Sequence, residues 1–383
     1  MFNMVNFKYS GVLLETDQCK EKFMQNYNYQ FNFNSNKYLY KNYQPTFKAT
    51  PTVKVASAKI EYAGRVISNK FYNLLLPKYL KKITADIASL TPARNRKFLE
   101  QLAEIGKLYA SQKIIDINIE DGILEQIAKS GKSAIFIMNH SNQYEDPQML
   151  AVLNTFLAEA YKKEGCDEFP LPKIIMNEDI LKTMDPVRRK AYENFGAIGI
   201  DATVNGGNKG VNARAFLPLI KDFIQDKCNI FIFPEGRLAV RKNLAFCDRF
   251  QDGIGSLINK ILSIKKEATI VPVGFAYGKD EQKNLTAINV GTPIIIKRDG
   301  ENTTITKGDI CKNPESGLYG FFEKHKDQEN VTITSDGIPV EQHEIPDYLN
   351  PILCENLDIN TEMAIKKLDE PVSESDMNEF DFS

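Results

Sequence analysis

Residues 133–147 read SAIFIMNHSNQYEDP, and this stretch is the strongest indication of fold and chemistry in the chain. A short apolar run ends at Asn139 and His140, and two acids, Glu145 and Asp146, follow in the same loop. Five apolar residues before a polar loop are typical of a buried strand. The chain has 3 histidines, and His140 is the one at a strand end with carboxylates nearby. An imidazole oriented by a carboxylate is what a general base needs.

From residue 132 onward, apolar segments alternate with helical ones. We predict strands at 134–138, 173–176, 198–200, 229–233, 269–273, 288–290 and 294–296, and helices at 147–163, 211–227 and 252–266. Apolar strands between helices predict an α/β fold, with a mixed, largely parallel sheet flanked by helices. Sites in such folds collect where loops leave the strand ends, and His140 lies in such a loop.

The sequence divides into four regions. Residues 1–55 are rich in Asn, Lys and Tyr and predict a disordered extension. Residues 56–130 carry apolar positions at helical spacing, such as Phe98 and Leu102, and predict a helical region before the sheet. We assign 131–326 to the α/β domain and 327–383 to an acidic, partly disordered C-terminal tail.

Composition excludes several classes of function. The net charge of −2 gives no global field for nucleic acid. The 6 cysteines are scattered, which argues against zinc sites of the paired-cysteine kind and for reduced thiols in the cytoplasm. No apolar run is long enough to span a membrane, and no secretory signal is visible, whereas organelle targeting stays open.

Residues 68–82, SNKFYNLLLPKYLKK, combine Phe, Leu and Tyr with lysines and contain no acid. Such a segment can lie on an anionic membrane surface, which predicts peripheral membrane contact. The alternative is an ordinary helix that packs its leucines on the core and exposes its lysines to water.

A second strand end reads FPEGRLAVRK at 233–242. The predicted strand breaks at the proline, and the turn presents Glu235, Gly236 and Arg237, with Arg241 close behind. A guanidinium recognises phosphate oxygens through two parallel hydrogen bonds, and glycine lets the backbone approach a ligand. The alternative is a plain turn with an Arg–Glu pair on the surface.

Four motifs occur in a fixed order: Asn-His at 139–140, Asp-Pro at 146–147, Phe-Pro-Glu-Gly-Arg at 233–237 and Val-Pro-Val-Gly at 271–274. Together they resemble the glycerolipid acyltransferase family, which includes lysophosphatidate acyltransferases and soluble glycerol-3-phosphate acyltransferases. The resemblance covers about residues 132–297. It implies acyl transfer from a thioester, on coenzyme A or acyl carrier protein, to a glycerol hydroxyl.

The resemblance implies that His140 deprotonates the acceptor hydroxyl and that a carboxylate orients its ring. The family has an aspartate after the histidine and four further residues, but Glu145 stands in that position here and Asp146 follows it. We favour Asp146, because the Asp-Pro pair begins the next predicted helix. A histidine that only holds its loop in place remains the alternative.

The resemblance also implies a binding site for the acceptor. Arg237 and Arg241 would hold its phosphate, and Lys209 or Arg214 would supply charge, because Ala202 stands where the family often has arginine. The site would be shaped by Asn139, which we expect to cap its loop, and by Glu235, Gly236, Pro272 and Gly274. Backbone N–H groups would serve the oxyanion.

We therefore predict an O-acyltransferase of phospholipid synthesis, cytoplasmic and peripheral at the membrane. The favoured acceptor is 1-acylglycerol 3-phosphate, and the alternative is glycerol 3-phosphate. The acyl thioester is a co-substrate, and no metal or other cofactor is expected. A non-catalytic protein that binds lipid or acyl carrier is the alternative from another class, and a thioesterase-like hydrolase is a third.

Overall fold

The apolar run at 134–138 forms strand β2 (Ala134–Met138), and all its residues are buried. β2 lies inside a 10-stranded sheet. The computed structural model describes residues 78–110, 114–119, 122–140, 146–166, 168–201, 209–235, 253–278, 285–335 and 337–369. All of them belong to one compact unit, Phe47–Ser383. The predicted extension at 1–55 and the start of the helical region lie outside the described residues.

The sheet has the strand order β10-β9-β8-β6-β2-β5-β3-β4, while β7 pairs with β6 and β1 with β7. The other strands are β1 (Ile114–Ile119), β3 (Leu171–Asn177), β4 (Ile198–Ile200), β5 (Cys228–Ile232), β6 (Glu267–Tyr277), β7 (Leu285–Val290), β8 (Ile294–Asp299), β9 (Asn302–Thr306) and β10 (Asn330–Thr332). From β6 across β2, β5 and β3 to β4 every neighbouring pair is parallel. Their carboxyl ends therefore share one edge of the sheet.

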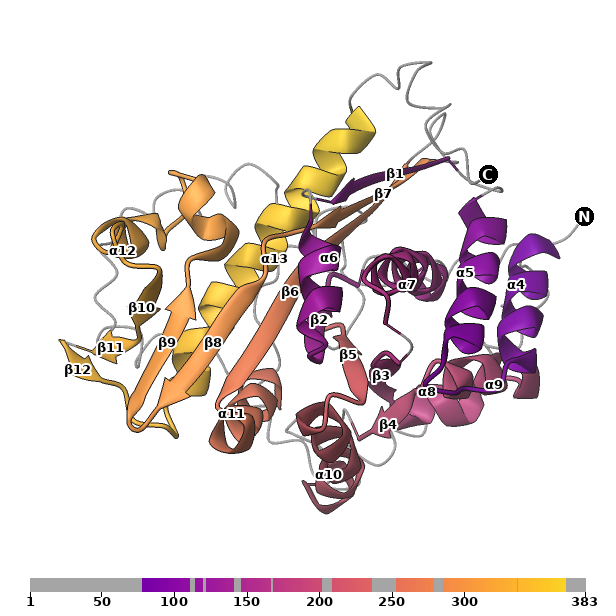
Figure 1. Cartoon of the computed structure of the whole chain (residues 1–383), viewed down its shortest axis with the longest axis horizontal. Coiled ribbons are helices and arrows are strands. Elements are labelled where there is room, and N and C mark those ends of the chain that lie inside the picture. The colour runs from indigo at the N-terminus through magenta and orange to yellow at the C-terminus, as the bar shows by residue number, and fades with distance from the viewer. Residues whose placement is uncertain are drawn as a thin grey trace, which may run out of the picture. The chain divides into compact units, whose positions relative to one another are not determined.

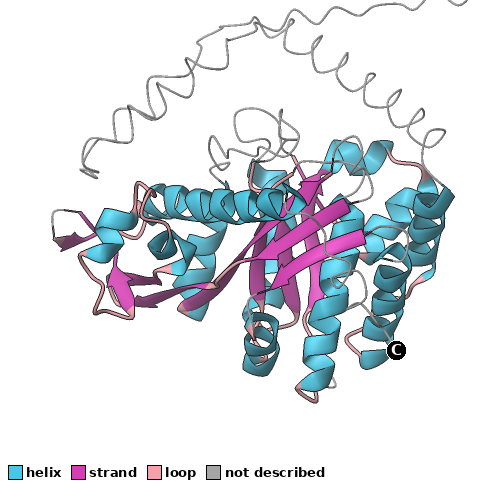
Figure 2. Ribbon diagram, turned by 90° about the horizontal axis from the view of Figure 1, so that it is seen from above, coloured by secondary structure: helices cyan, strands magenta, loops and turns pink. Residues whose placement is uncertain are grey.

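Helices flank the sheet on both faces (Figures 1 and 2). They are α4 (Lys78–Ser89), α5 (Arg96–Ala110), α6 (Ile123–Ser130), α7 (Asp146–Lys163), α8 (Glu178–Thr183), α9 (Pro186–Asn194), α10 (Lys209–Ile224), α11 (Gly253–Lys265), α12 (Tyr319–Glu323) and α13 (Ile345–Asp369). A 3-10 turn, η2 (Gly308–Lys312), and a small hairpin, β11 (Thr334–Ser335) with β12 (Ile338–Pro339), complete the described elements. The predicted mixed, mostly parallel sheet between helices is confirmed.

Side chains of β6 alternate between the two faces, as the pleat of a strand requires. Val271, Val273 and Phe275 belong to the apolar core formed with α5, α6 and α7. Ala276 packs on the opposite side with Ala364 of α13. Figure 1 shows α13 lying across β6 and β7. The parallel half of the sheet is thus buried on both faces, which is why its strands read as continuous apolar runs.

One segment of the predicted helical region is a strand. Residues 114–119, IIDINI, form β1, which pairs in parallel with β7 from Ile114↔Leu285 to Ile119↔Val290. The region 56–130 is therefore helical only in part of its described residues. Pairing with a strand far along the chain decides the conformation, and the local pattern of a short isoleucine-rich segment does not.

The region predicted as a tail from 327 contains structured elements up to Asp369. β10 extends the sheet beside β9, and the helix α13 buries Leu349, Leu353 and Leu357 completely. These leucines repeat at a helical spacing, and the acidic residues around them concealed that pattern. Residues 370–383, the most acidic part, lie outside the described residues.

Candidate active site

His140 lies at the shared carboxyl edge of the parallel strands. β2 and β5 are neighbours in register, with Ile137 opposite Ile232. The residues that directly follow these strands, Asn139–His140 and Phe233–Glu235, therefore lie side by side. The His140 ring is half-buried, and its centroid lies 4.5 Å from that of Phe233, with the ring planes 30° apart. The fold thus brings the Asn-His motif together with the first residue of the Phe-Pro-Glu-Gly-Arg motif.

The Asn139 side chain links the end of β2 to β6, the neighbouring strand on the side away from β5. Its side chain is 0% exposed, and its Nδ2 donates to the carbonyl of Phe275 at 2.9 Å. The Phe275 N–H donates back to Asn139 Oδ1 at 2.6 Å. These bonds continue the β2–β6 pairing beyond its last backbone pair, Met138↔Val273. Asn139 therefore bonds to the neighbouring strand, whereas the predicted cap on its own loop stays a prediction, because residues 141–145 lie outside the described part of the chain.

The acid that would orient His140 is not placed. Residues 141–145 lie outside the described part of the chain, and so does the side chain of Asp146. Asp146 is the first residue of α7, with Pro147 in its first turn, where proline is well tolerated. The choice between Glu145 and Asp146 stays a prediction.

Glu235 follows β5 in a turn with Pro234, and its side chain is only 7% exposed. A buried carboxylate costs free energy unless polar groups compensate it. Glu235 is therefore not an exposed turn residue, and its pairing with Arg237 in the alternative interpretation is not tested. Gly236, Arg237 and Arg241 lie outside the described residues, and their predicted roles remain predictions. Glu235 and the His140–Phe233 contact occupy neighbouring positions at the edge of the sheet.

The start of α10 is fixed at the same edge. Asn212 of α10 accepts a hydrogen bond from the Asp201 N–H at 2.7 Å and donates to the Asp201 carbonyl at 2.9 Å. Asp201 directly follows β4, so the first turns of α10 lie where β4 ends. Arg214 is exposed there and has no hydrogen-bond or ion-pair partner among the described residues. Lys209 begins α10, but its side chain is not described.

Comparison with known families agrees with this arrangement. A search of curated proteins finds no match to the chain. A family model described as Acyltransferase matches residues 118–276, from the end of β1 to near the end of β6. Residues 118–276 are a domain of the glycerolipid acyltransferase family. This domain supports general acyl transfer in glycerolipid synthesis.

At two positions of the acyltransferase domain, close packing leaves no room for a side chain larger than that of glycine. Gly196 has a φ of 70°, and a Cβ atom there would lie 2.4 Å from the Pro172 carbonyl oxygen. A Cβ atom at Gly274 would lie 2.1 Å from the Asn360 backbone oxygen. Both Gly274 and Pro272 are buried within β6, before its carboxyl end. Their predicted role as walls of the cleft stays a prediction, whereas the contact of Gly274 with α13 is direct.

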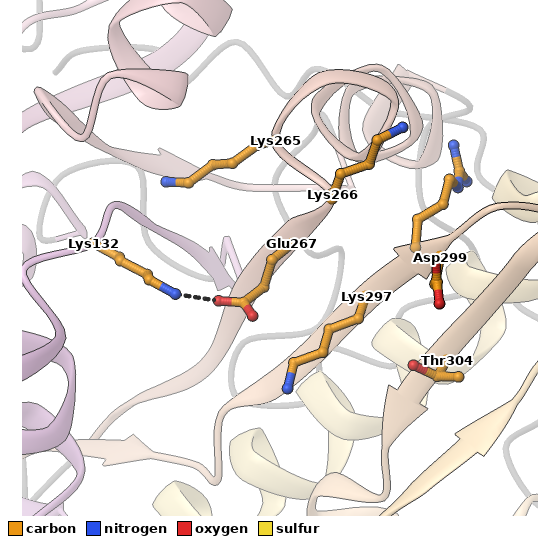
Figure 3. Close-up of a pocket in the computed structure, with 8 residues that line it drawn as sticks. Lys132, Lys265, Lys266, Glu267, Lys297, Asp299 and Thr304 are labelled. Atoms are coloured by element: carbon orange, nitrogen blue, oxygen red, sulfur yellow. Dashed lines mark hydrogen bonds and ion pairs between the residues drawn. The ribbon is translucent and has the colours of Figure 1, made fainter.

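A cavity of about 670 Å³ lies at the opposite edge of the sheet, where β6 begins and β8 ends (Figure 3). Its charged lining consists of Lys132, Lys265, Lys266, Glu267, Lys297, Arg298 and Asp299. Lys132 Nζ lies 2.8 Å from Glu267 Oε1. The cavity lies where β6 begins, whereas His140 follows the carboxyl end of the neighbouring strand β2, so we do not assign the predicted acyl transfer to this cavity.

Within the described residues, no group of three or more His, Cys, Asp or Glu side chains could hold a metal ion. The described cysteines Cys166, Cys228, Cys311 and Cys354 are free. None of the described helices is long and apolar enough to cross a bilayer. Phe233 is the site residue that the sequence did not single out, although an aromatic residue directly before the Pro-Glu-Gly turn was visible.

Proposed function

We propose that the chain transfers a fatty acyl group from a thioester, on coenzyme A or acyl carrier protein, to the free hydroxyl of 1-acylglycerol 3-phosphate. The observation that carries this proposal is the position of His140. It stands half-buried at the carboxyl end of β2, beside Phe233 at the end of β5. Ligands of open α/β sheets bind at this edge.

The proposed reaction needs one base and no covalent intermediate. His140 accepts the proton of the acceptor hydroxyl while the hydroxyl oxygen attacks the thioester carbonyl carbon. The carbon–sulfur bond then breaks, and the thiolate takes the proton back from the imidazolium. The products are an ester and a free thiol, so atoms and charge balance. Such proton transfer by a positioned side chain contributes roughly 10²- to 10⁴-fold to a rate.

Positioning of the base supports the proposal. Asn139 is bonded to β6 through both polar atoms of its amide, and Phe233 packs against the His140 ring from β5. Both strands that neighbour β2 thus contribute a contact here, β6 to Asn139 and the end of β5 to the His140 ring. A base held in this way is ready to meet a hydroxyl without reorganisation, which is a main source of catalytic rate.

Recognition of the acceptor would come from cations at the same edge. Arg237 and Arg241 follow the buried Glu235 turn, and Arg214 is exposed near the end of β4. Arginine binds phosphate in a bidentate way, which would orient the glycerol hydroxyl toward His140. We extend the proposal to work at a membrane surface, because the favoured acceptor is amphipathic and α4 exposes Lys81 and Lys82.

An activity panel tests the proposal. The purified full chain is given acyl-coenzyme A or acyl carrier protein as donor, and 1-acylglycerol 3-phosphate or glycerol 3-phosphate as acceptor, and thiol release and ester formation are followed together. We expect equal amounts of thiol and ester, with the lysophospholipid favoured. A preference for glycerol 3-phosphate would replace the acceptor and keep the reaction.

Two outcomes would reject acyl transfer. Thioester binding without turnover for either acceptor would indicate the non-catalytic binding protein. Thiol release with free fatty acid and no ester would indicate a hydrolase, in which water replaces the hydroxyl. A further assay tests the membrane contact by sedimentation with vesicles that contain either anionic or only zwitterionic lipid. Absence of binding to both kinds of vesicle would reject the contact.

A further inference from the structure

Helix α13 lies outside the segment matched by the acyltransferase family, residues 118–276. It nevertheless contacts β6, the strand whose Phe275 is hydrogen-bonded to Asn139. Its residue Asn360 is 0% exposed. The Asn360 amide accepts a hydrogen bond from Asn289 Nδ2 of β7 at 2.5 Å and donates to Asp309 Oδ2 at 3.0 Å. It thus joins α13 to β7 and to the turn η2.

Asp309 gives this junction a buried carboxyl group, and Lys312 Nζ lies 3.3 Å from its Oδ1. The residue is 2% exposed, and its carboxylate accepts hydrogen bonds from the Thr292 N–H at 2.9 Å and the Thr292 hydroxyl at 2.7 Å, besides that from Asn360. Buried polar networks whose members are all bonded hold one arrangement of the elements that they join. The network therefore fixes how far α13 lies from the sheet.

The backbone of Asn360 meets β6 at Gly274, where a Cβ atom would lie 2.1 Å from the Asn360 oxygen. Only glycine allows the helix to come this close. Gly274 is followed by Phe275, whose N–H and carbonyl carry both hydrogen bonds of Asn139. Asn139 in turn precedes His140. A continuous series of contacts thus leads from α13 through β6 to the proposed base.

We propose that Asn360 is a positioning residue for the acyl-transfer reaction. It holds α13 against Gly274, which fixes the Phe275 backbone and, through Asn139, the His140 ring. This inference rests on the proposed function for its effect on rate. Its effect on the geometry of His140 does not depend on that function and can be measured separately.

The test compares Asn360→Leu with the matched control Asn356→Leu. Asn356 lies one turn earlier on α13, is equally buried and bonds to the same turn through the Asp309 N–H at 2.9 Å. The Asn356 side chain lies against Gly308, whereas the Asn360 side chain lies against Gly291 and the Asn360 backbone against Gly274. We expect both variants to lower the melting temperature. Only N360L should lower kcat, by tenfold or more, with KM for the thioester changed less than twofold.

A second readout separates this inference from the proposed function. The chain has 3 histidines, so NMR of the imidazole ring protons gives a simple spectrum, in which H140A identifies one signal. N360L should shift the His140 signal and leave those of His325 and His343 in place, whereas N356L should shift none of them. This holds even if the enzyme shows no transfer with the acceptors tried.

Two results would overturn the positioning role: equal effects of N360L and N356L on kcat, or an unmoved His140 signal in folded N360L. If N360L does not fold, Asn289→Ala replaces it, because that change removes one bond of Asn360 and leaves Asn360 in place. N289A should then shift the His140 signal in the same direction by a smaller amount, and an unmoved signal again rejects the proposal.

Discussion

The two edges of the sheet use polar residues in opposite ways. At the carboxyl edge, two of the described polar residues are buried: Asn139 is bonded to Phe275, and Glu235 lies in its turn. At the other edge most of the charged residues that line the cavity reach solvent, and the Lys132–Glu267 pair is 51% and 29% exposed. Charges in contact with water keep a protein soluble, whereas chemistry needs polar groups in fixed positions. The numerous charges therefore do not mark the site.

The largest effect short of removing the base is expected from Asn139→Leu. The change leaves the Phe275 N–H and carbonyl without their partner, and each unsatisfied buried group costs about 1–3 kcal/mol. We expect the free energy of unfolding to fall by about 2–4 kcal/mol and kcat to fall roughly 100-fold, because His140 loses its support from β6. Denaturant titration and initial rates measure the two effects, and full activity in the folded variant would remove Asn139 from the site.

Arg237→Ala should act on the acceptor alone. Losing a bidentate phosphate contact costs on the order of a few kcal/mol, so KM for the acceptor should rise roughly 10- to 100-fold while KM for the thioester stays unchanged. A matched control is Arg189→Ala, because Arg189 pairs with Glu193 on the exposed side of α9. An equal rise in KM for donor and acceptor would show that Arg237 does not bind the acceptor phosphate.

A half-buried acid away from the carboxyl edge, Glu355, should affect stability and leave activity unchanged. Burial raises the pKa of Glu355 on α13, and hydrogen bonds from Ser316, Gly317 and Leu318 lower it in part. A raised folded-state pKa means that the folded protein loses stability as the pH rises from the ordinary glutamate range through that pKa. The melting temperature of the Glu355→Gln variant should therefore exceed that of the wild type by more at pH 7 than at pH 4. The opposite order would contradict the burial effect.

The smallest effect is expected at the charged edge. Lys132→Ala removes one member of a largely hydrated ion pair, so stability should change by less than about 1 kcal/mol, and less still at high salt. Acyl transfer should stay within twofold of the wild type. A large loss of activity would show that the cavity beside Lys132 belongs to the reaction, and the contrast between the two edges would fail.

Much of the parallel half of the fold was visible in the sequence, because its strands are apolar on both faces and read as short runs. The strand at 198–200 has the predicted bounds, and the helix predicted at 147–163 begins at Asp146. β1 was missed because it is a strand only through its pairing with β7, and α13 because acidic residues surround its leucines. Short patterns cannot show pairings that distant parts of the chain create.

The site shows the same division. His140 and the Phe-Pro-Glu-Gly-Arg motif are local patterns, and their contact follows from two parallel strands that end at one edge. The partner of Asn139, in contrast, lies 136 residues away. The contact between Gly274 and Asn360 depends on helix α13, which contains none of the motifs found in the sequence. Residues that act through local chemistry are predictable, and residues that hold them in place need the structure.

The most direct measurement is the single-turnover rate of acyl transfer by His140→Ala beside His343→Ala, with thioester binding measured on the same preparations. His343 is an exposed histidine, 75% accessible and paired with Glu341, so its loss controls for removal of an imidazole. We expect H140A to bind thioester normally and to transfer at least 100-fold more slowly, and H343A to match the wild type. Unchanged transfer by H140A would contradict the account.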